Sequence, residues 1–188
     1  MKKIRIRMNS WIYTITIITF FVTIAISYIT DVLMGNTGLI VAIFVVLAIV
    51  LIGIIFDTIG VAVATGTKQP FHSMAASKIK SAKYSLLLLN NASQVSNFFN
   101  DVIGDIAGII SGAASAVIVV KILSLNGDFF NQSVISVLLS SVVACLTVGG
   151  KAIGKEIAMS YSKEIVNFTG KVLFVINEKT FFKFIKNI

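Results

Sequence analysis

Four long apolar stretches dominate the chain, and they predict four helices that cross a membrane. They cover residues 11–30, 38–67, 98–120 and 132–150, and the second contains one charged residue, Asp57. A helix needs about 20 mostly apolar residues to cross the hydrocarbon core of a bilayer. Each stretch is long enough, so we expect an all-α membrane protein with four transmembrane helices.

Two amphipathic segments accompany these spans. Residues 69–94 carry apolar side chains at helical spacing with lysines between them, and so do residues 153–172. Such helices typically lie along a membrane surface, so we expect amphipathic juxtamembrane helices that cap the bundle. We interpret 1–188 as a single membrane domain with an extra N-terminal span (11–30), a three-span region (38–175) and a basic amphipathic tail (176–188).

The composition excludes a soluble enzyme and a disordered chain. Hydrophobic residues make up 56% of the sequence and charged residues only 13%, whereas soluble domains carry roughly 25% charged residues. The single cysteine, Cys145, allows no disulfide framework. No nucleotide-binding loop, serine-hydrolase motif or zinc-protease motif occurs, so we expect neither an enzyme nor a nucleic-acid partner. A signal peptide at 11–30 is the alternative to a retained span, but the apolar stretch exceeds the usual 7–15 residues.

The basic residues predict the orientation of the spans. Fifteen of the 16 lysines and arginines flank the spans on one side, and only Lys121 lies on the other. Loops rich in Lys and Arg stay in the cytoplasm. We therefore expect a multi-pass protein of the inner (cytoplasmic) membrane with both termini in the cytoplasm.

Polar residues inside the spans are the candidate functional residues, because ionisable groups are costly at membrane depth. Carboxylate and amide oxygens are the ligands that Mg²⁺ and Ca²⁺ prefer. We predict that such oxygens form a metal site with Lys151 as their charge partner; the set is Asp57, Asn100, Asp101 and Asp105. For Asp57, the alternative is a side chain that reaches the cytoplasmic surface.

Small residues follow the same spans. In the third, Gly104, Gly108, Gly112 and Ala116 form a ladder that lets another helix approach closely, so this span is expected at the centre of the bundle. In the fourth, a small and hydroxylated stripe leads to Lys151: Ser133, Ser136, Ser140, Ala144 and Thr147. Helix packing alone is the alternative explanation for both. The Thr and Gly residues that follow Asp57 predict a break in the second span.

Three segments resemble the membrane domain of the cyclin-M/CorB/CorC family over residues 38–175. They are IIFDTIGVAVAT, NNASQVSNFFNDVIGDIAGIISGAA and TVGGKAIGKEIAMSYSKEIVNFTGKVL. The resemblance implies three spans, a juxtamembrane helix, a homodimer and magnesium transport. Of the family's magnesium ligands only Asn100 is matched; Asp57 stands in place of a serine and Lys151 in place of a glutamate, and the chain has no nucleotide-binding CBS pair.

These observations together predict transport or sensing of a divalent cation of the magnesium or cobalt class through a polar intramembrane cavity. Mg²⁺ would be the transported or bound ion, and the partners would be membrane lipids and a second copy of the chain. Two alternatives remain open at this stage. One is a degenerate homologue in which Lys151 occupies the metal position and the chain acts as a structural or regulatory subunit. The other is a proton-coupled transporter.

The charge distribution generates a topology prediction. With Cys145 replaced by serine, a cysteine introduced at Asn36 is expected to react with a membrane-impermeant maleimide in intact cells. A cysteine at Lys80 is expected to react only after permeabilisation, because the lysine-rich side faces the cytoplasm. The reverse labelling pattern would contradict the orientation.

Overall fold

The computed structural model describes residues 10–126 and 131–176, and all regular elements of this part are helices, with no strand. This confirms the all-α prediction. The elements are α1 (Ser10–Gly35), α2 (Leu39–Thr65), α3 (Gln69–Ala76), α4 (Lys80–Asn90), α5 (Ala92–Asn97), a π-helix η1 (Phe98–Gly104), α6 (Asp105–Asn126), α7 (Gln132–Ser160) and α8 (Ser162–Ile176). The basic residues before residue 10, and residues 177–188 of the predicted basic tail, lie outside the described residues.

Four helices are long and apolar enough to cross a membrane: Tyr13–Gly35, Leu39–Thr65, Ala92–Leu125 and Gln132–Ser160. The first span continues five residues past its predicted end, and the last two are also longer than the sequence pattern predicted. The third includes α5, η1 and α6, and the fourth continues ten residues past Gly150. Its glycines do not end α7, because flanking Ala, Ile and Lys residues favour helix. Lys151 and Lys155 therefore lie within α7 and not in a tail.

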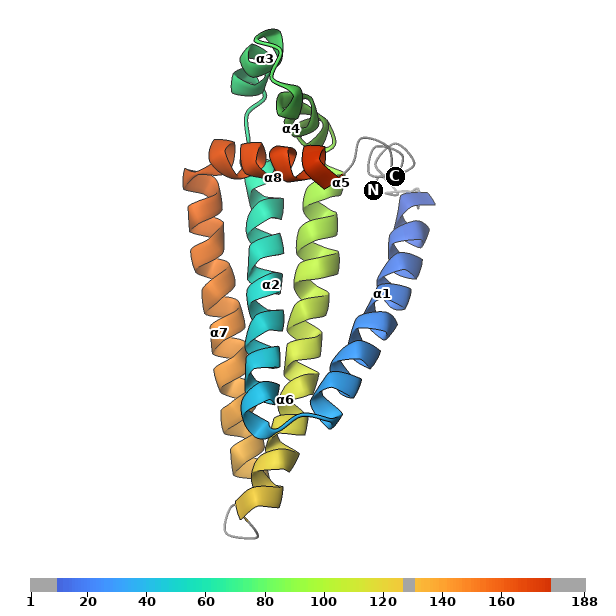
Figure 1. Ribbon diagram of the computed structural model, residues 1–188, viewed down its shortest axis with the longest axis vertical. Coiled ribbons are helices and arrows are strands. Elements are labelled where there is room, and N and C mark those ends of the chain that lie inside the picture. The colour runs from blue at the N-terminus through green and yellow to red at the C-terminus, as the bar shows by residue number, and fades with distance from the viewer. Residues whose placement is uncertain (1–9, 127–130, 177–188) are drawn as a thin grey trace, which may run out of the picture.

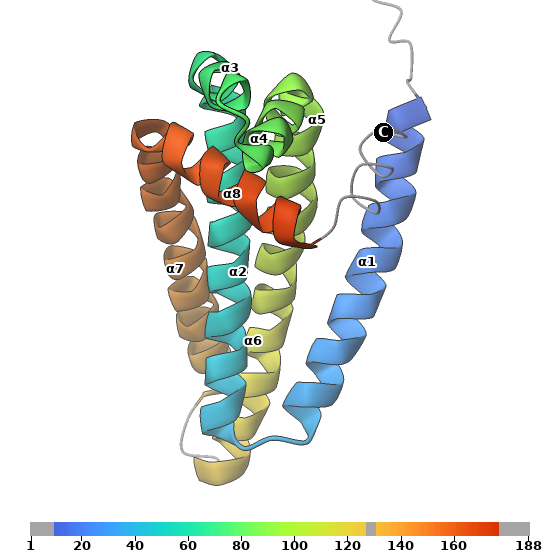
Figure 2. The same ribbon diagram turned by 45° about the horizontal axis from the view of Figure 1, so that its top comes forward.

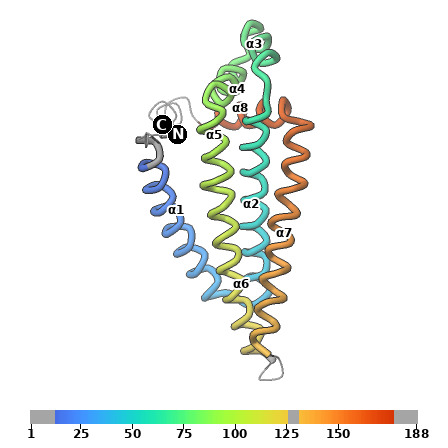
Figure 3. Tube along the Cα trace, turned by 180° about the vertical axis from the view of Figure 1, so that it is seen from behind, coloured from blue at the N-terminus to red at the C-terminus, as the bar shows by residue number. Residues whose placement is uncertain are grey.

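The long helices form a three-helix bundle with one outlying helix. In Figure 1, α2, α6 and α7 run side by side, while α1 leans away from α6 toward the end where the chain begins. Figure 3 shows the same divergence from behind. At that end α8 lies across the bundle, and α3 and α4 stand beyond it, as the tilted view in Figure 2 shows. We call α3, α4 and α8 the cap.

Three hydrophobic clusters hold the described part of the chain together, and the smallest packs Ile15 and Val22 of α1 against Val102, Ile106 and Ile110 of η1 and α6. At the end away from the cap, Met34 of α1 packs with α2, α6 and α7 around Val46 and Ile118. Under the cap, Phe71 of α3 and Leu88 of α4 pack against Val63 of α2 and Val166 of α8. The buried side of α8 is Val166, Thr169, Gly170 and Leu173. Other apolar residues of the predicted amphipathic segment 153–172, including Phe168 and Val172, are largely exposed on the opposite side of the helix.

Glycines bring the three central helices into close contact. Gly150 and Gly154 of α7 face Ile54 and Thr58 of α2, with no room for a Cβ atom at either glycine. A Cβ on Gly53 of α2 would lie 2.8 Å from the Ala107 Cβ on α6. Small residues permit this packing, which is the main force for helix association in lipid. The predicted ladder on α6 contributes only in part, since nothing lies within 4 Å of a Cβ placed on Gly112.

The predicted break after Asp57 is wrong, because α2 runs unbroken from Leu39 to Thr65. The hydroxyl groups of Thr58 and Thr65 donate to the carbonyls of Ile54 and Val61, at 2.7 and 2.9 Å, so they do not compete with the helix. The irregular backbone lies instead in the π-helix η1, which joins α5 to α6.

The prediction of a single helix over 69–94 is also wrong. The segment contains α3 and α4, which are separated at Lys78, whose φ of 62° is left-handed, and α5 begins at Ala92.

The two glycine environments of α7 predict opposite effects of the same substitution. Gly154→Ala is expected to lower the melting temperature in detergent, because the added methyl group meets the Thr58 hydroxyl; overpacking costs about 1–3 kcal/mol. Gly149→Ala is the control in the same helix. Nothing lies within 4 Å of its Cβ position, so it is expected to raise the melting temperature through helix propensity, by up to about 1 kcal/mol. Equal shifts would contradict the close contact of α7 with α2.

Candidate functional site

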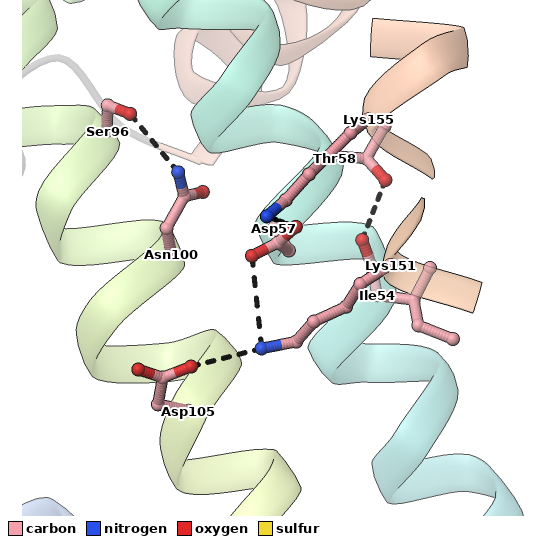
Figure 4. Close-up of polar contacts among 8 residues, drawn as sticks. All are labelled: Ile54, Asp57, Thr58, Ser96, Asn100, Asp105, Lys151 and Lys155. Carbon is pink, nitrogen blue, oxygen red and sulfur yellow. Dashed lines mark hydrogen bonds and ion pairs between the residues drawn. The ribbon is translucent and has the colours of Figure 1, made fainter. Parts of the chain in front are cut away.

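A cluster of paired charges lies where α2, α6 and α7 meet, with Asp57 buried and the side chains of Lys155 and Asp105 51% and 62% exposed. Asp57 comes from α2, Asp105 from the first turn of α6, and Lys151 and Lys155 from successive turns of α7. Asp57 is only 3% exposed, on a helix whose other buried residues are apolar or glycine. Figure 4 shows both lysine side chains reaching from α7 toward Asp57.

The distances define how the charges are shared. The Lys151 ammonium donates a hydrogen bond of 3.1 Å to Asp105 Oδ1 and lies 3.9 Å from Asp57 Oδ1. Lys155 Nζ lies 3.9 Å from Asp57 Oδ2 on the other side. Two ammonium groups thus face two carboxylates, and their formal charges cancel. Gly104 of η1 lies beside the pair, since a Cβ on it would be 3.5 Å from both Asp57 Oδ1 and Lys151 Nζ, an ordinary contact distance.

Asn100 lies beside the cluster but takes no part in its ion pairs. It projects from η1, donates through Nδ2 to Ser96 Oγ at 3.3 Å, and packs against Gly60 of α2. The Oδ1 atom of Asn100 and the Oδ2 atom of Asp57 are buried acceptors without a hydrogen-bond donor among the described residues. The site therefore contains two oxygens whose hydrogen-bonding capacity is unused.

Asp101 has different surroundings from the other predicted site residues. It is exposed and lines a cavity of about 430 Å³ beside α1, with Thr16, Thr19 and Asn97. Within residues 10–126 and 131–176, no three His, Cys, Asp or Glu side chains come together in a way that could hold a metal ion. The metal site of Asp57, Asn100, Asp101 and Asp105, and Mg²⁺ as its ion, remain predictions.

Sequence reasoning missed Lys155 and Ser96. Lys155 follows Lys151 by four residues, so both lie on one face of any helix that contains them. That spacing could have indicated the second ammonium group, but the fourth span was predicted to end at Gly150, which leaves Lys155 outside it. Ser96 precedes Asn100 by one helical turn and carried no signal of its own.

These features define a class of protein: an α-helical bundle whose internal charges are neutralised by one another. The family model described as "Carbapenam-3-carboxylate synthase, N-terminal" matches residues 39–184, which is more than half of the chain. The chain belongs to this family. The match begins at Leu39, the first residue of α2, and leaves α1 outside. No curated protein and no solved structure matches the chain.

The family match corrects two predictions. The resemblance to the cyclin-M/CorB/CorC family is wrong, and so is the prediction of divalent-cation transport or sensing, because the matching family is associated with an enzyme. The segments behind the resemblance are short and rich in Gly, Ala and Ile, a composition common to closely packed apolar helices. Asn100 was the one matched ligand, and the lysine at 151 pairs with Asp105. A predicted homodimer remains a prediction.

The cluster predicts non-additive effects of substitution. Lys151→Met is expected to destabilise the bundle, because it leaves the buried Asp57 carboxylate with one ammonium group, that of Lys155, in place of two. Adding Asp105→Asn is expected to restore part of the loss, since it removes the carboxylate that accepts from Lys151. Adding Asp101→Asn is the matched control, because Asp101 pairs with neither lysine among the described residues. Thermal unfolding in detergent is measured for the wild type, the three single variants Lys151→Met, Asp105→Asn and Asp101→Asn, and the two double variants. Additivity of the Lys151–Asp105 pair within about 0.3–0.5 kcal/mol would mean that the two groups do not interact.

Proposed function

We propose that this chain is a membrane-embedded module of a carbapenam-3-carboxylate synthase system. It anchors the enzyme at the cytoplasmic membrane surface and carries no catalytic site of its own. The proposal combines the family match with one structural observation: the ion pairs of Asp57, Asp105, Lys151 and Lys155 tie together the three long helices that the family match covers. A bundle fixed in this way suits a scaffold.

The surface of the bundle supports insertion into a membrane. Large apolar side chains are exposed along the long helices, among them Phe21, Phe44, Val137 and Val148. A continuous apolar surface of this extent is typical of a lipid-facing protein. The lysines of the cap lie at one end of the bundle. At the other end, Lys121 of α6 donates a hydrogen bond of 2.6 Å to the carbonyl of Thr37, in the connection between α1 and α2. The excess of lysine at the cap supports a cytoplasmic cap.

The charge cluster is poorly suited to catalysis. Covalent catalysis needs a nucleophile held beside a general base, and the charged side chains of this cluster pair with one another instead. Both lysines of the cluster lie within 3.9 Å of a carboxylate oxygen. The pairs therefore stabilise the assembly of helices, and catalysis would belong to the synthase itself.

The cap offers a surface on which an enzyme could be held. Its helices pack on one another through Leu88 and Val166, and Ser85 Oγ donates to the Val166 carbonyl at 3.2 Å. This bond joins residues 81 positions apart, so the cap is tied to itself as well as to α2. It would present a fixed platform above the membrane surface.

The test is a sedimentation assay. Membranes that contain the chain are mixed with a soluble carbapenam-3-carboxylate synthase, and product formation is measured in the pellet and the supernatant. Activity is expected to move to the pellet only when the chain is present, with membranes from the same host lacking the chain as the control. Equal activity in both pellets would overturn the anchoring role. Product formation by the purified chain alone would overturn the assignment of a non-catalytic module.

A further inference from the structure

A cavity of about 520 Å³ in the cap has a strongly basic lining. It lies where the turn between α3 and α4 meets the end of α8, and three lysines line it: Lys78, Lys80 and Lys83. No carboxylate pairs with any of these lysines in the described part of the chain. The sequence from Thr58 to Asn100 contains no acidic residue at all. The lining therefore concentrates positive charge, and the segment that carries the three lysines has no acidic side chain to neutralise it.

The remaining lining of the cavity is apolar and aromatic. Tyr84 and Phe174 meet edge to face, with ring centroids 5.9 Å apart, and Ile79 lies beside them. Ile79 is 42% exposed although it is apolar. A ligand that fits this lining carries an anionic group for the lysines and an apolar part for the rings.

The backbone at Lys78 supports a role for its side chain. The Lys78 N–H donates to the Ala75 carbonyl at 2.9 Å, and the Ile79 N–H donates to the Met74 carbonyl at 3.1 Å. This pattern ends a helix with a left-handed residue, a position that glycine usually occupies. Lys78 occupies it with φ of 62°, which a residue with a Cβ adopts only at some cost. Backbone strain of this kind is common at binding sites.

The start of α4 adds to the attraction for an anion. The helix begins at Lys80, and its N-cap residue, Ile79, provides no side-chain acceptor for the first N–H groups. Free N–H groups and the helix dipole favour negative charge at this end.

We propose that this cavity binds a phosphate-bearing ligand, with Lys78, Lys80 and Lys83 contacting the phosphate and Tyr84 and Phe174 contacting an apolar portion. The phosphate can come from the headgroup of an anionic phospholipid or from a soluble phosphorylated compound. Lysine is a common phosphate-binding residue, and charge-assisted hydrogen bonds are the stronger ones. The site goes beyond the anchoring function and does not depend on it.

The test uses the full chain in phosphatidylcholine nanodiscs. One arm titrates inorganic phosphate, and the other adds phosphatidylglycerol to the nanodisc; the melting temperature is measured in both. A rise in the phosphate arm indicates a soluble source, and a rise in the phosphatidylglycerol arm indicates a lipid headgroup. Either response supports the site, and no response in both arms overturns it.

Two triple variants separate the cavity from general surface charge. Replacement of Lys78, Lys80 and Lys83 by glutamine is expected to weaken binding at least about tenfold, because one charge-assisted hydrogen bond corresponds to about that factor. Replacement of Lys68, Lys163 and Lys171 removes the same charge from the same end of the chain, outside the cavity lining. It is expected to change binding by less than about threefold, the effect of screened surface charge. Equal losses would overturn the site.

A single substitution at Lys78 tests the strained backbone directly. Lys78→Gly is expected to raise the melting temperature without ligand, because glycine adopts the left-handed conformation without cost. The same variant is expected to bind the phosphate group more weakly. Unchanged binding would overturn the assignment of Lys78 to the ligand, and because this variant keeps the fold, loss of folding cannot account for the result.

Discussion

The fold depends on the ion pairs that Asp57, Asp105, Lys151 and Lys155 make between three helices. A charge buried alone in an apolar bundle is strongly unfavourable, and removal of one partner costs more than replacement of the whole group. The buried Asp57 carboxylate therefore requires the ammonium groups of Lys151 and Lys155, whereas the Asp105 side chain, which is 62% exposed, depends less on its partner. This condition links α2, α6 and α7 more specifically than apolar packing could, because Leu, Ile and Val side chains tolerate sliding of one helix past another.

Close backbone approach is the second condition, and it makes the first possible. Gly150 and Gly154 bring α7 against α2, and Gly53 brings α2 against Ala107 of α6. Only at this separation can lysines on α7 reach carboxylates on both neighbours. The outlying α1 shares neither the glycine contacts nor the ion pairs, and the family match omits it as well. Packing and family membership thus single out the same part of the chain, from α2 to α8.

Much of the fold was predictable because membrane-length apolar stretches constrain helices strongly. The end of α7 was not predictable from hydropathy: Lys151 and Lys155 look like a boundary until their partners on α2 and α6 are known. The unbroken α2 was missed for a related reason, since the local preferences of Thr58 and Gly60 were outweighed by packing against α7 and Asn100. In the site, the partners of Lys151 could not be predicted from the sequence, because they come from other helices. The four-residue spacing between Lys151 and Lys155 could be seen in the sequence and places both on one face of a helix. The resemblance to a transporter family failed because short motifs of small residues are shared by unrelated helix bundles.

The π-helix η1 has a consequence for how the cap is aligned with the bundle. Each i→i+5 hydrogen bond in η1 encloses one residue more than an α-helical bond does, so α5 and α6 are out of phase along a single rod. Since an α-helix turns about 100° per residue, loss of one residue from this segment would rotate α5, and the cap helices connected to it, through about that angle relative to α6. The number of residues in this one stretch of helix therefore sets the direction in which the cap faces, and an insertion or deletion there would change it.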